Sequence, residues 1–307
     1  MTSPVKMIID TDPGVDDAIA IALAHAMPQI DLLGLTTAFG NTFVTQSSRN
    51  ARYLLSMLGA DAPVAQGAAL PVGATQYEPS ANVHGPEGFG DITDIPQIGN
   101  DSPLSAAEFL CEMARSHAGE LVVCAVAPLT NIADALALDL SFAHNVKQLV
   151  IMGGAYETAG NITSFAEANI YHDPIAADRV FASEMNISMV GLNATLQTLM
   201  TPDDFADMAV SAPKIGGFIN QISKFYLEFY RSFGITEGCP MHDAAAVLAC
   251  TDPERFDWLP SGIRVNTSGA DIGATLPDSA RKPARIAVGV DAAWAQELIK
   301  SSIASLG

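Results

Sequence analysis

The stretch Met7-Ile8-Ile9-Asp10-Thr11-Asp12-Pro13-Gly14-Val15-Asp16-Asp17-Ala18 decides the fold predicted for this chain. Residues 5–9 have the apolar character of a buried strand, residues 13–14 predict a tight turn, and residues 16–27 have the pattern of a helix that begins with two acids. Four carboxylates therefore lie within eight residues, directly after an apolar strand. Open α/β sheets bind their ligands at this end of a strand.

The four carboxylates predict a cation site. Like charges packed this closely disfavour one another unless a counter-ion offsets them. Oxygen donors with no Cys or His among them suit Ca²⁺ or Mg²⁺, and a flexible cage rich in carboxylates favours Ca²⁺. The alternative is a solvated acidic turn, and the apolar strand in front of the acids argues against it.

Composition bounds the class of protein. The chain has 307 residues, of which 49% are hydrophobic, enough for a substantial core, and we expect one domain spanning residues 1–307. The 15 Lys and Arg against 34 Asp and Glu give a formal charge of -19, which predicts no nucleic-acid partner and no anionic membrane surface. The sequence shows no signal-peptide pattern and no apolar run of membrane-spanning length, so we expect a soluble, cytoplasmic protein.

The four cysteines are expected to be structural. They are Cys111, Cys124, Cys239 and Cys250, with no Cys-x-x-Cys spacing among them. Three of them lie in apolar surroundings typical of small buried thiols.

Apolar segments alternate with segments of helical spacing. Strands are expected near residues 5–10, 31–37, 121–126, 147–152, 187–192 and 285–290. Helical spacing occurs in residues 43–58, 103–116, 174–184 and 214–230, among others. The alternation predicts an α/β fold built from parallel βαβ units.

Polar residues follow several of these strands. They are found in Phe39-Gly40-Asn41, Pro128-Leu129-Thr130-Asn131, Met152-Gly153-Gly154, residues 161–169 and His242-Asp243. A long Gly/Pro-rich stretch, residues 67–103, contains His84 and is predicted to be a functional loop. Because the carboxyl ends of parallel strands share one edge of the sheet, these groups are expected to converge on one crevice.

With these motifs the chain closely resembles the inosine–uridine-preferring nucleoside hydrolase family, whose N-terminal signature is Asp-x-Asp-Pro-Gly-x-Asp-Asp. The resemblance runs from Ile8 to at least Ala246. It implies Ca²⁺-dependent hydrolysis of the N-glycosidic bond of ribonucleosides to ribose and free base, in nucleoside salvage or catabolism. It also implies a mainly parallel central sheet flanked by helices. Since relatives are commonly homo-oligomers, a dimer or tetramer is expected.

The resemblance carries a metal set over to this chain. It implies that Ca²⁺ is held by the side chains of Asp12, Asp17 and Asp243 and by the backbone carbonyl of Val126. Many relatives have Thr at this last position, but only the carbonyl is used. Asp12 is expected to act also as the general base that activates water. Asp10 is expected to orient its neighbours without touching the metal.

The resemblance also implies a substrate-binding set. Asp16 and Asn41 match the residues that bind the 2′- and 3′-hydroxyls of ribose. Asn161, Glu167 and Asn169 match those that bind the remaining hydroxyls, and Met152 is expected to pack against the sugar ring. Between Glu167 and Asn169 this chain has Ala168, where relatives commonly carry Phe. The preferred base is therefore left open.

The leaving base needs a proton or a hydrogen bond. His242 is the candidate general acid and His84 the second candidate. The alternatives are that His242 only caps its helix and that His84 is an exposed loop residue. Tyr226, Tyr230 and Phe233 are expected to line the base pocket. The helical spacing of Phe225 and Phe229 predicts core positions instead.

Two other functions compete with this one. A phosphatase of the haloacid-dehalogenase type is disfavoured because Gly14 stands where that family has Thr or Val, and because the Asp16-Asp17 pair has no place in it. A non-catalytic nucleoside- or sugar-binding protein that keeps the ion site is the second alternative. Against it, every position assigned to ion, water and ribose carries a competent side chain.

Overall fold

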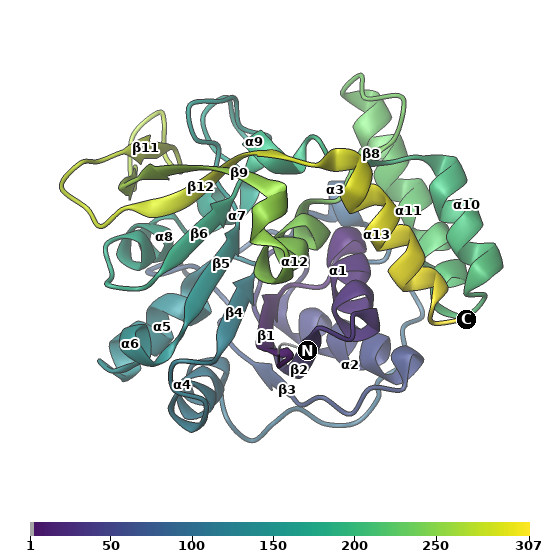
Figure 1. Cartoon of the computed structure of the whole chain (residues 1–307), viewed down its shortest axis with the longest axis horizontal. Helices are drawn as coiled ribbons and strands as arrows, with labels where there is room; N and C mark the ends of the chain where they lie inside the picture. Colours follow the sequence, from purple (N-terminus) through teal and green to yellow (C-terminus); the bar gives the residue numbers. More distant parts are fainter. Residues whose placement is uncertain (1–2) are drawn as a thin grey trace.

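The computed structural model describes residues 3–307, and its centre is an eight-stranded sheet (Figure 1). The strands lie in the order β3-β2-β1-β4-β5-β6-β12-β9, and all neighbouring pairs are parallel except β12 and β9. They are β1 (Val5–Thr11), β2 (Ile30–Thr37), β3 (Val64–Gln66), β4 (Val122–Ala125), β5 (Gln148–Met152), β6 (Ile187–Val190), β9 (Phe256–Ser261) and β12 (Ala284–Val290). The predicted α/β fold with a mainly parallel sheet is confirmed.

The six expected strands are β1, β2, β4, β5, β6 and β12. Two strands of the central sheet were not expected. β3 has only three residues, and β9 contains Asp257 and Pro260 in place of a continuous apolar run. β9 tolerates this proline because it is the edge strand. Two small antiparallel pairs lie outside the central sheet, β7 (Leu199–Met200) with β8 (Cys239–Pro240), and β10 (Ile263–Val265) with β11 (Thr275–Pro277).

Helices cover both faces of the sheet (Figure 1). One face is packed by α1 (Val15–Ala26), α2 (Val44–Leu58), α9 (Leu192–Thr195) and α12 (His242–Thr251). The same hydrophobic core extends into α11 (Ile215–Ser232) and α13 (Ala292–Ala304), which pack against α1, and into α10 (Pro202–Ser211), which packs against α11 and α13. The other face is packed by α4 (Ala106–Ser116), α5 (Thr130–Leu138), α6 (Phe142–Asn145), α7 (Ala168–His172) and α8 (Pro174–Phe181). Two short elements, α3 (Ala81–His84) and a 3₁₀ turn (Pro253–Arg255), complete the set.

The two-residue period of the strands divides the core between these faces. In β1, Met7 and Ile9 pack into the first layer and Ile8 into the second. Because both faces are covered, the central strands are apolar on both sides. This explains why they were recognisable from sequence as continuous apolar runs.

The order of the strands predicts where a ligand binds to the sheet. From β1 the chain builds outward through β2 and β3 on one side, and β4, β5 and β6 follow on the other side. The carboxyl ends of β1 and β4 therefore form a switch point, where open α/β sheets bind ligands. The helices that start beside this point, α1 and α12, are buried along nearly their whole length and pack against each other.

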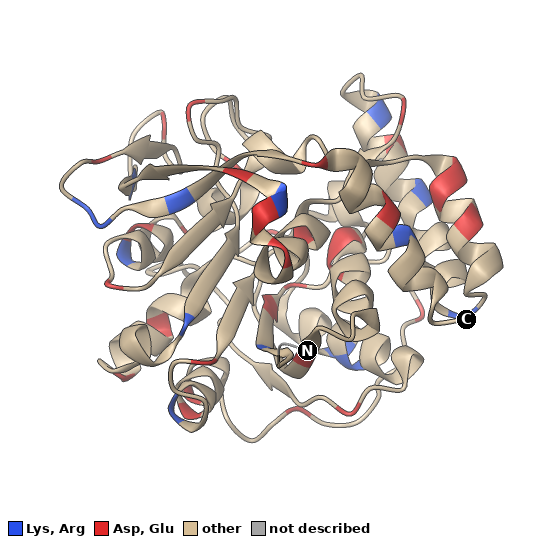
Figure 2. Cartoon of the chain, viewed as in Figure 1, with Lys and Arg blue, Asp and Glu red and all other residues tan. Residues whose placement is uncertain are grey.

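Within residues 3–307, no helix combines the length and the apolar character that a membrane crossing requires. In the view of Figure 2 the basic residues are scattered over the molecule, with acidic residues among them. All four cysteines are buried with free thiols, as expected for structural positions.

Candidate active site

The turn between β1 and α1 is organised around the Asp17 carboxylate. Its Oδ1 accepts hydrogen bonds from Thr11 Oγ1 at 2.5 Å and from the backbone N–H of Asp12 at 3.2 Å. Its Oδ2 accepts the backbone N–H of Gly14 at 2.9 Å and the side-chain amide of Asn41 at 3.0 Å. The first turn of a helix favours a carboxylate, so this arrangement stabilises the start of α1 as well as the site.

The Asp12 carboxylate has one bonded and one free oxygen. Its Oδ2 accepts the backbone N–H of Asn41 at 2.6 Å. Its Oδ1 is buried and has no hydrogen-bond partner among the described residues. A buried carboxylate oxygen without a donor costs free energy unless a ligand or ion satisfies it. Asp12 therefore has an oxygen available for a group that is not part of the chain.

Carboxylates from two helices meet beside it. Oxygens of Asp16, Asp17 and Asp243 lie within 4.8 Å of one another, and all three side chains are buried. Burial, and then the neighbouring Asp17, raises the pKa of Asp16 to about 8. Burial likewise raises the pKa of Asp12 and of Asp243 well above the usual range. A divalent cation bound to these hard oxygen donors would offset the repulsion, so the residues present fit a metal ion.

Val126 and Asp10 lie at the ends of β4 and β1. Val126 is one of the residues that line the cavity described below, and its carbonyl accepts the side-chain amide of Asn169 at 3.0 Å. Asp10 Oδ1 accepts bonds from Thr36 Oγ1 at 2.6 Å and Asn131 Nδ2 at 2.7 Å, and burial raises its pKa to about 7. Asp10 is thus bonded to a residue of β2 and to a residue in the first turn of α5.

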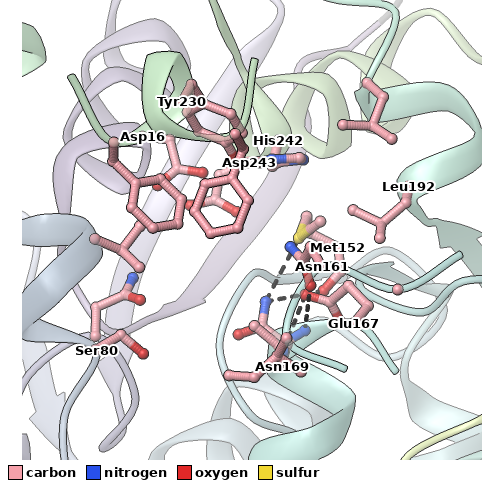
Figure 3. A pocket seen from close by; sticks show the side chains of 18 of the residues that line it. Asp16, Ser80, Met152, Asn161, Glu167, Asn169, Leu192, Tyr230, His242 and Asp243 are labelled. Atoms are coloured by element: carbon pink, nitrogen blue, oxygen red, sulfur yellow. Dashed lines mark hydrogen bonds between the residues drawn. The ribbon is translucent and has the colours of Figure 1, made fainter. Parts of the chain in front are cut away.

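Several polar side chains face the carboxylate cluster from the opposite side of the cavity (Figure 3). The side-chain amide of Asn169 donates to the carbonyls of Val126 at 3.0 Å and Met152 at 3.2 Å, so its carbonyl oxygen stays available. Glu167 accepts backbone N–H groups of Gly154 and of the first turn of α7, which positions its carboxylate. Asn161 Oδ1 accepts the N–H of Ala168 at 3.0 Å. The structure therefore brings together the expected ribose-binding residues from β5, the following loop and α7.

Hydroxyl and imidazole groups form a chain along one wall. Tyr226 Oη donates to Asp16 Oδ2 at 3.3 Å and lies 3.4 Å from Tyr230 Oη. Tyr230 Oη lies 2.7 Å from His242 Nε2, and His242 Nδ1 lies 2.7 Å from Thr195 Oγ1. Both ring nitrogens of His242 are thus bonded to hydroxyls, and burial lowers its pKa to about 4. The lowered pKa favours the neutral form of His242, which lines the cavity described below beside its partner Tyr230.

His84 is buried within the site, so the alternative that it is an exposed loop residue is wrong. It ends the short helix α3, is only 6% exposed, and its ring lies against Tyr226 with centroids 5.3 Å apart. Its Nδ1 accepts the N–H of Val15 at 3.2 Å, so its proton is carried on Nε2. Burial, and then the nearby His242 and His172, lower its pKa to about 3.

These groups surround a cavity of about 720 Å³. Among its lining residues are Asp16, Asn41, His84, Val126, Met152, Asn161, Glu167, Ala168, Asn169, Tyr226, Tyr230, His242 and Asp243. Asp12 and Asp17 are buried next to this wall and bonded to Asn41.

Part of the lining was not predicted from the sequence. Phe229 was expected in the core, but it is half-buried and lines the cavity together with Leu192 and Leu196. Phe233, which was expected to line the base pocket, is exposed and also lines the cavity. Phe225 is also only half-buried. The spacing of α11 places several aromatic residues along the helix but does not say which of them reach the core. Thr195, the partner of His242, carried no signal in the sequence.

The chain matches the family model described as inosine-uridine preferring nucleoside hydrolase over residues 7–297. It is 40% identical to uridine nucleosidase 1 of Arabidopsis thaliana over 90% of this chain and 83% of that protein. It is 38% identical to the non-specific ribonucleoside hydrolase RihC of Escherichia coli over 94% of this chain and 93% of that protein.

Solved structures of similar fold belong to nucleoside hydrolases as well. A plant nucleoside hydrolase, the PpNRh1 enzyme, superposes with a TM-score of 0.95 at 34% identity, covering 98% of this chain and 99% of that one. The purine-preferring ribonucleoside hydrolase from Gardnerella vaginalis superposes with a TM-score of 0.94 at 33% identity, covering 98% of both chains. The sequence, the sheet and the acidic pocket lead to one conclusion: the chain belongs to the inosine–uridine preferring nucleoside hydrolase family and is a hydrolase of N-glycosidic bonds.

Proposed function

We propose that this protein is a Ca²⁺-dependent hydrolase that splits ribonucleosides into ribose and free base in nucleoside salvage or catabolism. The observation that carries this proposal is the free, buried Oδ1 of Asp12 beside the cluster of Asp16, Asp17 and Asp243. We further propose that residues 1–307 act as a single domain, in the cytoplasm, as a homo-oligomer.

The metal set is assigned to Asp12, Asp17, Asp243 and the carbonyl of Val126. Bound calcium would supply positive charge that offsets the carboxylates and polarises the oxygen atoms beside it. The closeness of Asp16 to Asp17 and Asp243 also places Asp16 at the edge of this set. We assign Asp16 to the ribose because its carboxylate lines the cavity and is held by Tyr226.

Asp12 is the proposed general base. Its bonded oxygen is fixed by Asn41, so the free oxygen has a defined direction in which to accept a proton from water. Cleavage builds positive charge on the sugar, and the surrounding carboxylates stabilise that charge. The acidic residues therefore serve both the ion and the transition state.

The ribose is held from both sides of the cavity. Asp16 lies on the side of the acidic cluster, where Asn41 is bonded to Asp17. The opposite side carries Asn161, Glu167, Asn169 and Met152 (Figure 3). The leaving base is placed toward Tyr226, Tyr230 and His84. A hydrogen bond to the base is supplied through the chain that joins His242 to Tyr230.

We assign no base preference from the relatives, because their names differ in the base that they specify. Their names specify uridine in Arabidopsis, no single base in Escherichia coli and purines in Gardnerella. Ala168 lines this cavity where relatives of the family commonly carry Phe, which changes both the volume and the stacking surface.

The direct test is release of base from inosine and uridine. We expect release from at least one of them in the presence of Ca²⁺ and none after chelation. Binding of both nucleosides without any release, at saturating Ca²⁺, would support the non-catalytic alternative instead.

Calcium is expected to stabilise the fold. If EGTA removes an ion present at about 100 times its Kd, the free energy of unfolding falls by about 2.7 kcal/mol, or roughly 5 °C in the midpoint of thermal unfolding. The physical reason is that the carboxylates of Asp16, Asp17 and Asp243 lose their counter-ion. Scanning calorimetry with EGTA, followed by addition of Ca²⁺ or Mg²⁺, measures the shift. An unchanged midpoint would contradict a structural calcium site.

Nucleosides without the 2′-hydroxyl are expected to be poor substrates. Without the 2′-hydroxyl, the buried carboxylates near Asp16 lose a hydrogen-bonding partner. An unsatisfied buried group of this kind costs about 1–3 kcal/mol of binding free energy. We therefore expect kcat/KM for 2′-deoxyinosine to be about tenfold or more below that for inosine. Comparable values for the two nucleosides would refute the proposed ribose contacts.

A further inference from the structure

The peptide group between Gly40 and Asn41 sets the orientation of Asp12. Its N–H, from Asn41, donates to Asp12 Oδ2 at 2.6 Å, among the shortest hydrogen bonds of the site. Gly40 approaches so closely that a Cβ added there would lie 1.8 Å from Asp12 Oδ2. Only glycine leaves room for this contact. The direction of one peptide plane thus decides where the free oxygen of Asp12 points.

The other end of this same peptide group is held by Tyr77. The hydroxyl of Tyr77 donates to the carbonyl of Gly40 at 2.6 Å, and the N–H of Ser80 reaches that oxygen at 3.4 Å. Tyr77 belongs to the long Gly/Pro-rich segment that sequence analysis marked as functional without naming this residue. One peptide group is therefore bonded at its oxygen to Tyr77 and at its N–H to Asp12.

The Tyr77 side chain is itself fixed. Its ring packs edge-on against Phe39, with centroids 4.7 Å apart, and against His172, with centroids 5.5 Å apart. His172 Nδ1 lies 3.3 Å from the hydroxyl. Because the only hydrogen of the phenol is directed to Gly40, this contact requires the N–H tautomer of His172 at Nδ1. Phe39 and His172 thus limit the movement of the hydroxyl.

We propose that Tyr77 is a positioning residue for Asp12: through the Gly40–Asn41 peptide it aims the free oxygen of Asp12 at the reacting water and at the calcium ion. This inference rests on the proposed function, which gives Asp12 both tasks. A hydrogen bond accepted by the carbonyl polarises the peptide and strengthens the bond that its N–H donates. Small displacements of a base have large effects on rate, even when they arise in a residue that does not touch the substrate.

The test compares Tyr77→Phe with Tyr53→Phe. Tyr77→Phe keeps the ring contacts with Phe39 and His172 and removes the hydroxyl, with its short bond to Gly40 and its longer contact to His172 Nδ1. Tyr53 is the matched control because its half-buried ring packs on Phe89 and Phe218 in the core, so the same atom is removed elsewhere.

For the better of inosine and uridine, at saturating Ca²⁺, we expect Tyr77→Phe to lower kcat about tenfold and to leave KM within about twofold. Tyr53→Phe is expected to match the wild type in both. A role limited to holding the loop would instead raise KM or lower the unfolding midpoint while leaving kcat unchanged. A loss confined to KM, or equal kcat values in the two variants, would overturn the inference.

A second readout does not depend on turnover. Calorimetric titration with Ca²⁺ alone is expected to show weaker binding in Tyr77→Phe, by about threefold to tenfold, and no change in Tyr53→Phe. If the wild type releases no base, the proposed function is wrong, and this titration still decides the role of Tyr77. Equal calcium affinities in the two variants would then overturn the inference on its own.

Discussion

Asp12→Asn is expected to lower kcat by about 10² or more at saturating Ca²⁺ and nucleoside. The substitution keeps the volume of the side chain and an oxygen that can accept the N–H of Asn41. It replaces the free, buried oxygen by an amide that cannot take a proton from water. Steady-state kinetics with inosine and uridine, at Ca²⁺ concentrations raised until the rate no longer changes, provide the measurement.

The fold of this variant is expected to remain intact. In EGTA its unfolding midpoint should be no lower than that of the wild type, because one of several mutually repelling carboxylates has been removed. Asp61→Asn, an identical change at an exposed position, is the matched control and should keep full activity. A folded Asp12→Asn protein with near-normal kcat would remove Asp12 from the role of base.

The central strands could be predicted because parallel strands buried on both faces leave continuous apolar runs. That is why β1, β4 and β5 were visible from sequence alone. The edge strand β9 was not, since it is exposed along one edge and tolerates Asp257 and Pro260. Its antiparallel direction depends on pairing with β12, which no local pattern encodes.

The site could be predicted only where its residues share a motif or a strand end. Asp12, Asp16 and Asp17 are close together in the sequence, and their position after β1 predicted that their carboxylates would cluster. The bond between Tyr226 and Asp16 joins residues 210 positions apart, and only the folded chain specifies it. Tyr77 and Thr195 were missed for the same reason, because their contacts with Gly40 and His242 are set by tertiary structure.

His242→Ala is expected to distinguish two classes of substrate. Inosine, which has a poor leaving group, should slow by roughly 10² or more because the hydrogen bond to the departing base is lost. A riboside with an activated leaving group, such as p-nitrophenyl riboside, needs little assistance and should be nearly unaffected. The comparison of kcat/KM for the two substrates separates help to the leaving group from general damage to the neighbouring Asp243.

Tyr230→Phe provides the second variant for this prediction. It removes only the hydroxyl that lies 2.7 Å from His242 Nε2, and it leaves Asp243 and its backbone untouched. If assistance reaches the base through this hydroxyl, Tyr230→Phe should show the same contrast between inosine and the activated riboside as His242→Ala. Equal losses on both substrates, in both variants, would make His242 a structural neighbour of the metal ligand. The donor would then be sought at Tyr226, which bonds to Asp16, or at His84, whose protonated Nε2 belongs to a ring stacked on Tyr226.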